Sequence, residues 1–277
     1  MMNEAKRQSV HWRMVLALLG AGCGVAMLAG GDACAQAAAG TDGDWQLRGG
    51  LGLLHTGKYL GSRESRWLAL PMLDARHKSG FFASGLRGVG FASPLGESMQ
   101  AWAAVGLDGH QRRRKDNSQF ALLPEVKMAP ALRLGLEYQQ GATQWSVVLN
   151  SRLDGKRSEG LQRGASTLDL EALSTVFQGH QWQLSAGARL SLMNSRFAQN
   201  FLGVGRHQIA GTTLRPYSAK AGVLSATAVL QAQVQLDPQW SLWARAEYER
   251  LPAAVADSPL VQRKSSLTQM LLVSRAF

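Results

Sequence analysis

Cysteine is almost absent from this chain. Among its 277 residues only Cys23 and Cys34 occur, and both lie within the first 35. If that segment is removed on export, the remaining chain holds no cysteine, which excludes a disulfide framework. The fold must then be stabilised by packing and by hydrogen bonds alone.

Long apolar runs are also scarce, and the clearest one lies near the N-terminus. A basic head precedes the apolar stretch from Met14 to Leu28, and Ala33-Cys34-Ala35 supplies the small residues that a signal peptidase cleaves. The apolar stretch is shorter than the roughly 20 residues that a membrane-spanning helix needs. We therefore expect a secretory signal peptide over residues 1–35, cleaved before Gln36.

Acidic residues are outnumbered, with 19 Asp and Glu against 30 Lys and Arg, a formal net charge of +11. The predicted signal peptide contains three basic and two acidic residues, so the exported chain keeps +10 of that charge. A surplus of this size favours contact with phosphates or other anions.

After residue 35 no apolar stretch is long enough to span a membrane as a helix, and the hydrophobic period is two. In residues 239–248 the apolar side chains from Trp240 to Tyr248 alternate with polar or charged ones such as Arg245 and Glu247. Alternation of this kind predicts β-strands. We predict eleven strand segments, at 45–54, 67–76, 81–91, 99–107, 128–138, 145–153, 166–177, 182–192, 224–236, 240–248 and 267–277.

These segments match the ~9 to 11 residues that a tilted strand needs to cross a bilayer. Short links at 139–143, 178–181 and 237–239 alternate with long ones such as 108–127 and 193–223. Outer-membrane barrels have this asymmetry, with tight periplasmic turns and longer outer loops. A soluble sandwich remains the alternative on periodicity alone.

A Trp follows each of these short links. Trp145, Trp182 and Trp240 would therefore lie at one level, as a periplasmic aromatic belt does. Together these features favour an all-β, transmembrane, antiparallel up-and-down barrel over residues 45–277, preceded by a periplasmic segment at 36–44. Because bacterial barrels have even strand numbers, one of the eleven segments must be misassigned. We prefer twelve strands, with ten as the alternative, and place the error between 45 and 107, where Pro71 interrupts a strand.

Four stretches of the sequence resemble the MltA-interacting protein family, also called MipA/OmpV. They are GKYLGSRESRWLALPMLDAR at 57–76, FFASGLRGVGF at 81–91, RFAQNFLGVGRHQIAG at 196–211 and ADSPLVQRKSS at 256–266. The resemblance implies an outer-membrane protein of the Gram-negative envelope. It also implies a scaffold that links a murein-cutting lytic transglycosylase to a murein-building penicillin-binding protein. Other members are described as adhesins or porin-like proteins, so an anion-preferring small-solute channel and a surface adhesin are the alternatives.

Motifs for enzyme chemistry are missing. The sequence contains neither an HExxH zinc motif nor a GxSxG nucleophile elbow. Asp108 with His110, or His207 with Asp257, could form a site at the outer rim, but the five histidines after residue 35 lie among many acids and pair easily by chance. We therefore expect a non-enzymatic protein with no catalytic residue, no metal and no cofactor.

Charged residues recur on the polar side of the predicted strands. They would either select solutes in a narrow pore or fill the lumen with ion pairs, and their mixed signs favour filling. The predicted lumen-facing charges are Arg48, Arg133, Glu137, Arg152, Asp169, Glu171, Arg189, Arg245 and Glu247.

The run Arg112, Arg113, Arg114 and Lys115 falls in a long outer loop. A solvated charge run is the ordinary interpretation, and lipopolysaccharide phosphates are the nearest anions that it could bind. Interleaved aromatic residues are missing, so we expect no nucleic-acid partner. The expected partners are outer-membrane lipid, lipopolysaccharide and the barrel-assembly machinery, besides the two murein enzymes.

Overall fold

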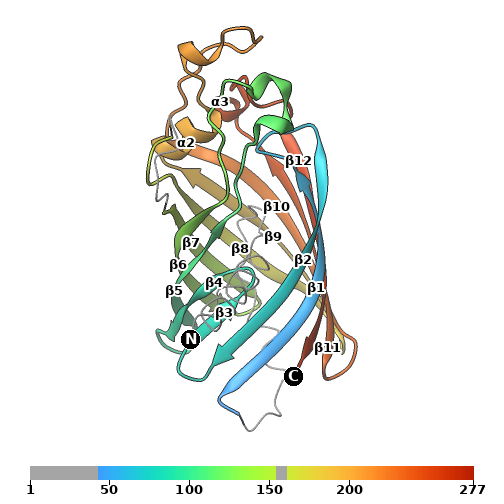
Figure 1. The fold of residues 1–277 in the computed structure, drawn as a ribbon. Helices are drawn as coiled ribbons and strands as arrows, with labels where there is room; N and C mark the ends of the chain where they lie inside the picture. The colour runs from blue at the N-terminus through green and yellow to red at the C-terminus, as the bar shows by residue number, and fades with distance from the viewer. Residues whose placement is uncertain (1–42, 154–160) are drawn as a thin grey trace, which may run out of the picture.

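The computed structural model describes residues 43–153 and 161–277, so the predicted signal peptide and most of the segment 36–44 lie outside the described residues. The described residues form a closed antiparallel barrel in which each strand pairs with its neighbours in sequence and β1 pairs with β12 (Figure 1). The strands are β1 (Trp45–Gly57), β2 (Ser65–His77), β3 (Phe81–Ser84), β4 (Gly88–Pro94), β5 (Met99–Asp108), β6 (Ala129–Gln140), β7 (Thr143–Arg152), β8 (Ser166–Gln178), β9 (Trp182–Met193), β10 (Gly222–Gln235), β11 (Trp240–Arg250) and β12 (Ser265–Ala276).

The described residues thus contain twelve strands, which confirms the preferred number and rules out ten. The single strand predicted at 81–91 is wrong, because it is the hairpin of β3 and β4. In both β3 and β4 the odd-numbered residues face outward and the even-numbered residues face the lumen. The alternation therefore continues through the hairpin tip, and periodicity cannot reveal the turn. Gly88 allows the tip to turn: its φ is 98°, and a Cβ there would lie 2.2 Å from the carbonyl oxygen of Val105.

Pro71 does not interrupt a strand. It lies within β2, where it pairs with Leu51 of β1 in an unbroken register from Ser65 to His77. Proline is tolerated on a strand edge that has no partner, because its missing N–H removes no ladder bond there.

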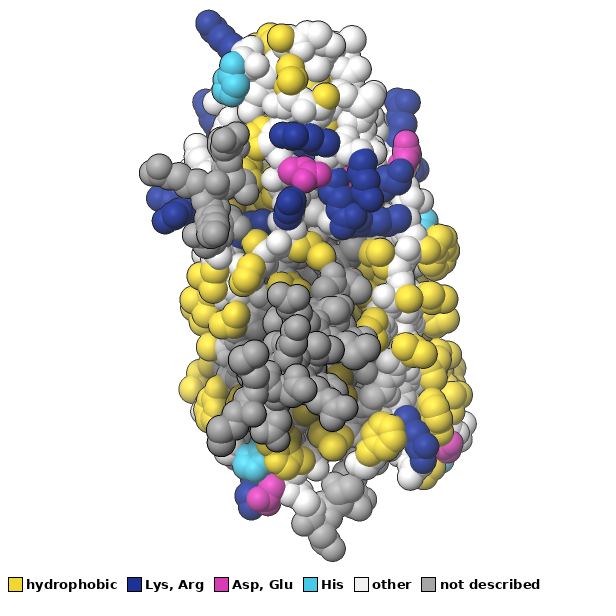
Figure 2. Space-filling model, viewed as in Figure 1, with side chains coloured by type: hydrophobic (Ala, Val, Ile, Leu, Met, Phe, Trp, Pro, Cys, Tyr) yellow, Lys and Arg dark blue, Asp and Glu magenta, His cyan; other side chains and the backbone are white. Residues whose placement is uncertain are grey.

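Side chains alternate between a lipid-facing exterior and the lumen. On β6, Leu132, Leu134 and Leu136 are exposed, whereas Arg133 and Glu137 are buried. On the face shown in Figure 2, yellow apolar side chains cover the wall below the basic residues of the cap. Some inward positions are apolar, and Val148, which breaks the pattern of its segment, packs inside the barrel with Phe82, Trp102 and Ala104.

Short turns join the strands at one rim, and the long loops pack into a cap at the other (Figure 1). Two apolar clusters hold the cap together, one around Phe197, Phe201 and Val255 and one around Tyr59 and Phe120. None of the described helices has the length and apolar character needed to cross a membrane. The helical elements of the cap are η2 (Arg114–Asp116), η3 (Ser118–Phe120), α2 (Ser195–Leu202), η4 (Arg206–Gln208) and α3 (Ala253–Ala256).

Candidate functional site

Four charged side chains form a network on the luminal face of strands β8 to β11. Arg245 donates to Glu171 at 2.6 Å and to Glu247 at 2.7 Å, and Arg189 donates to the same Glu247 at 2.7 Å. All four side chains are buried. Charges in a water-filled pore would be exposed, so this level of the lumen is filled by protein.

A second group fills the lumen beside β5 and β6. Glu137 of β6 accepts a hydrogen bond from Trp102 Nε1 at 2.8 Å and forms an ion pair with Arg87 at 3.1 Å. Trp102 lies over Gly135, where a Cβ would come within 2.1 Å of the indole ring. Arg133 donates to the carbonyl oxygen of Leu86 at 2.6 Å.

The structure buries eight of the nine predicted luminal charges and leaves Arg48 half-buried on β1. With Arg87 and Asp108, which the prediction did not include, the buried strand and hairpin-tip charges comprise five Arg and five acidic residues. These ten buried charges balance, so they give no net field that would favour anions.

Asp108 and His110, one of the two pairs considered for catalysis, lie in contact. Nδ1 of His110 is 2.6 Å from one Asp108 oxygen, and Arg152 donates to the other oxygen at 2.6 Å. Arg152 also donates to the backbone carbonyls of His110 and Lys127, at 3.2 and 2.7 Å. Both oxygens of Asp108 are therefore engaged in holding the loop that leaves β5.

The imidazole of His110 is held in a mostly buried site. Its ring packs edge-on against Phe197 and Phe201, at centroid distances of 5.2 and 5.8 Å. Desolvation disfavours the charged ring, but the charge of Asp108 and its hydrogen bond outweigh that cost and raise the pKa of His110. The second pair is not assembled: among the described contacts, the backbone of Asp257 accepts from Arg215, and none joins it to His207.

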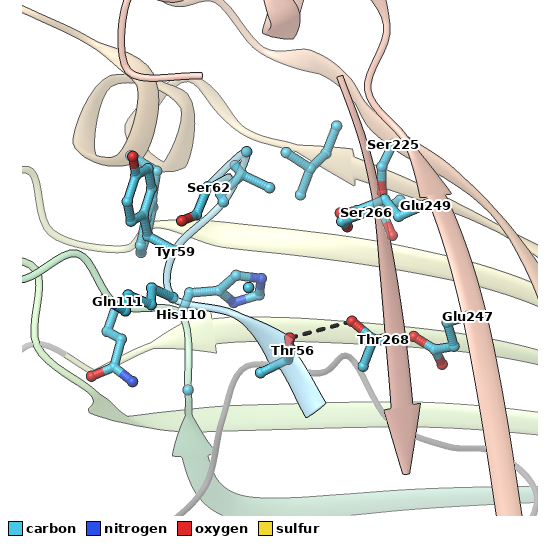
Figure 3. Close-up of a pocket in the computed structure, with 18 of the residues that line it drawn as sticks. Thr56, Tyr59, Ser62, His110, Gln111, Ser225, Glu247, Glu249, Ser266 and Thr268 are labelled. Atoms are coloured by element: carbon cyan, nitrogen blue, oxygen red, sulfur yellow. Dashed lines mark hydrogen bonds between the residues drawn. The ribbon is translucent and has the colours of Figure 1, made fainter. Parts of the chain in front are cut away.

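A polar cavity of about 100 Å³ lies between the luminal network and the cap (Figure 3). Its floor includes Glu247, and its walls include Thr56 and Thr268, whose hydroxyls are 3.2 Å apart. His110 and Tyr59 border it on the side of the cap. The volume holds several water molecules or one small polar solute. Among the described residues no group of three His, Cys, Asp or Glu side chains could hold a metal ion.

The basic run of the first long loop does not form one exposed patch. Arg112 is buried in the cap and donates to the carbonyl oxygens of Phe201 at 3.0 Å and Pro124 at 3.2 Å. Desolvation lowers its pKa to about 10, which leaves it charged at neutral pH. Arg112 therefore cannot reach lipopolysaccharide, whereas Arg114 and Lys115 are exposed and Arg113 is half-buried.

Trp145, Trp182 and Trp240 lie on the exterior near the rim of short turns. Trp182 stacks on Phe177 at 4.1 Å between ring centroids. The guanidinium of Arg275 lies over the rings of Trp240 and Phe277, at 5.8 and 5.4 Å, so this charge is accommodated at the rim by aromatic faces.

Sequence reasoning missed Arg87 and Trp102 as parts of the lumen. Arg87 lies in the hairpin tip, which was predicted to be the middle of a strand. Trp102 resembles a lipid-facing residue, but it is at an even-numbered position, whereas the exposed Val105 and Leu107 are at odd-numbered ones. For Trp102 strand parity was the available signal, because the predicted segment 99–107 nearly matches β5. For Arg87 there was no local signal, because the alternation continues through the hairpin tip.

A family model described as MltA-interacting protein MipA matches residues 49–277. Among solved structures, the NanC porin is similar over 83% of this chain and 98% of its own, with 10% identity and a TM-score of 0.39. The toluene transporter TodX of Pseudomonas putida is similar over 94% of this chain and 96% of its own, with 12% identity and a TM-score of 0.41. No curated protein matches.

Proposed function

We propose the following function for this chain, which belongs to the MltA-interacting protein MipA family. It is a non-enzymatic outer-membrane barrel that serves as a scaffold, binding a lytic transglycosylase and a penicillin-binding protein at its periplasmic rim. The family's name supports the first of these partners, and the resemblance of the sequence to the MipA/OmpV family supports the second.

The filled lumen is the observation that carries this proposal. Buried ion pairs of Arg189 and Arg245 occupy the barrel interior, and the loops pack over one mouth. A barrel filled in this way provides a rigid membrane anchor rather than a route for solutes. The Asp108–His110 pair supports the same interpretation, because Arg152 and the cap already engage it.

The rim of short turns faces the periplasm if the chain follows the usual orientation of outer-membrane barrels. Leu95 and Leu236 are exposed in two of its turns, and Phe277 is exposed at the chain end. These apolar side chains are anchors for a partner, which must cover about 800 Å² for a stable complex. Because the turns are short, that area requires contact with several of them at once.

Site-specific photo-crosslinking in intact cells tests the scaffold. A photoreactive amino acid at position 95 or 236 should capture a lytic transglycosylase and a penicillin-binding protein. Leu122, equally exposed but in the opposite cap, provides the matched control and should capture neither. Identical capture from all three positions, or no murein enzyme from positions 95 and 236, would refute the proposal.

The small-solute channel is the second candidate, and the cavity beneath the cap favours it. Conduction through that cavity would require the network of Glu171, Arg189, Arg245 and Glu247 to separate. Conductance measurements in planar bilayers distinguish the two functions.

A further inference from the structure

The barrel wall is interrupted on one side of β2. This strand pairs with β1 over its whole length, but it pairs with β3 only from Asp74 to Arg76. One further bond follows, from the N–H of Gly85 to the carbonyl oxygen of Leu73 at 2.8 Å. Beyond it, no strand of the described chain lies against residues 65–72 on that side.

The opposite border of the interruption belongs to β5 and the loop that leaves it. β4 pairs with β5 only as far as Val105, and residues 106–108 pair with β6 alone. The cause is the short hairpin, because β3 has 4 residues and β4 has 7, whereas β2 has 13.

Pro71 supports the same geometry independently. A Cβ built at Gly85 would lie 3.7 Å from the carbonyl oxygen of Pro71 and equally far from the backbone N and O of Leu73. The backbone groups of these odd-numbered residues therefore point toward the interruption. A proline in this position has no N–H to leave without a partner.

Beside the interruption, the outer face of β2 is apolar and exposed. Trp67 and Leu73 face outward on the same stretch of β2 and are 65% and 62% exposed, respectively, so lipid surrounds this edge. Unpaired backbone at that depth is costly, and closed barrels ordinarily avoid it.

The inner face of β2 beside the interruption is apolar. Leu68, Leu70 and Met72 point inward and pack in a cluster with Leu54 and Trp243. This cluster contrasts with the charged lumen at β8 to β11, and Leu68 and Met72 remain only partly buried.

The polar cavity touches both borders of the interruption. Arg66 of β2 lines it from one side, and Gly109, His110 and Gln111 line it from the other. Among the described residues, an apolar surface beside the interruption thus leads to a polar cavity under the cap. A molecule with an acyl chain and a polar end fits both parts.

We propose that the interruption between β2 and β5 is a lateral entrance for an acyl chain of an outer-membrane lipid. The chain lies along Leu68, Leu70 and Met72, and the polar end of the lipid lies toward the cavity. The apolar exterior is continuous with this inner surface, which identifies a membrane lipid as the occupant.

Photolabelling of the wild-type barrel tests the entrance. The protein is placed in phosphatidylethanolamine and phosphatidylglycerol vesicles that contain a phospholipid with a diazirine in its acyl chain, and labelled residues are mapped by mass spectrometry. Labelling should reach the inward residues Leu68, Leu70 and Met72 as well as the outward Trp67 and Leu73. Val229, inward and apolar on β10 with a strand on each side, is the matched control and should stay unlabelled.

A variant and a second crosslinker complete the test. Met72→Lys should lower labelling at Leu68 by about ten-fold, because a charge in an apolar entrance opposes an acyl chain. Heat-modifiable mobility on gels would verify that the variant folds. Labelling restricted to outward residues would overturn the proposal. A photoreactive residue at position 72 that captures the chain's own N-terminal residues or another protein, instead of lipid, would also overturn it.

Discussion

Individual side chains in the loops decide how the cap is attached to the barrel. Arg112 donates to carbonyl oxygens at Pro124 and Phe201, far apart in sequence, and His110 joins Asp108 to the rings of α2. Both residues are polar and placed in loops, so sequence alone suggests solvent exposure. Their burial makes each of them testable by a single substitution.

The raised pKa of His110 predicts a pH dependence of cap stability. The unfolded imidazole titrates near about 6.5, and the folded pKa lies above that value. The stabilisation from the charged pair is therefore complete below about 6.5 and is lost as the pH rises through the folded pKa. We expect proteolysis within 109–128 to accelerate over that range.

The control variants isolate this effect. His110→Gln should remove the pH dependence of proteolysis, whereas His180→Gln, at an exposed turn position, should retain it. A wild-type pH profile in His110→Gln would show that another group is responsible.

Replacing Arg112 should loosen the cap. Arg112→Met removes hydrogen bonds from a charged donor to two buried carbonyl oxygens, worth about 1.5 to 3 kcal/mol each in favourable cases. We expect faster proteolysis of the loops and a lower unfolding temperature in detergent. Arg114→Met, at an exposed neighbour, should change neither, and equal effects from the two substitutions would contradict the assigned role.

At the scale of the strands, luminal charges contributed by different elements stabilise the wall as a set. Glu171, Arg189 and the two charges of β11 span four consecutive strands, so no strand pair contains the whole network. The inner face of β2, by contrast, is apolar at Leu68, Leu70 and Met72. It lies beside the short hairpin of β3 and β4.

Breaking the luminal network should cost more than removing it. Arg245→Leu leaves Glu171 and Glu247 buried with less compensating charge, for which a loss of about 3 to 5 kcal/mol is typical. The double variant Arg245→Leu with Glu171→Leu removes one charge of each sign and should recover most of that loss. Denaturant unfolding followed by gel mobility would measure both, and a double variant as unstable as the single one would disprove the coupling.

At the scale of the whole molecule, a filled lumen and a packed cap oppose free diffusion. The wild-type protein in planar bilayers should therefore show no discrete conductance. A variant that combines Glu171→Ser, Arg189→Ser, Arg245→Ser and Glu247→Ser empties one level of the lumen. It should conduct if the cap also admits ions. Steady conductance from the wild type would favour the channel over the scaffold.

The sequence by itself determined the barrel, its alternating faces, the short and long connections and the family resemblance. These features are local, because side-chain direction alternates with a period of two and the length of a turn is set by consecutive residues. Tertiary structure alone decided that residues 81–91 form a hairpin, that Arg112 is buried, and which charges pair. Arg245 meets Glu171 from 74 residues away, and Arg189 meets Glu247 from 58. Such pairs depend on barrel closure and strand register, which set the distance between side chains that no local pattern relates.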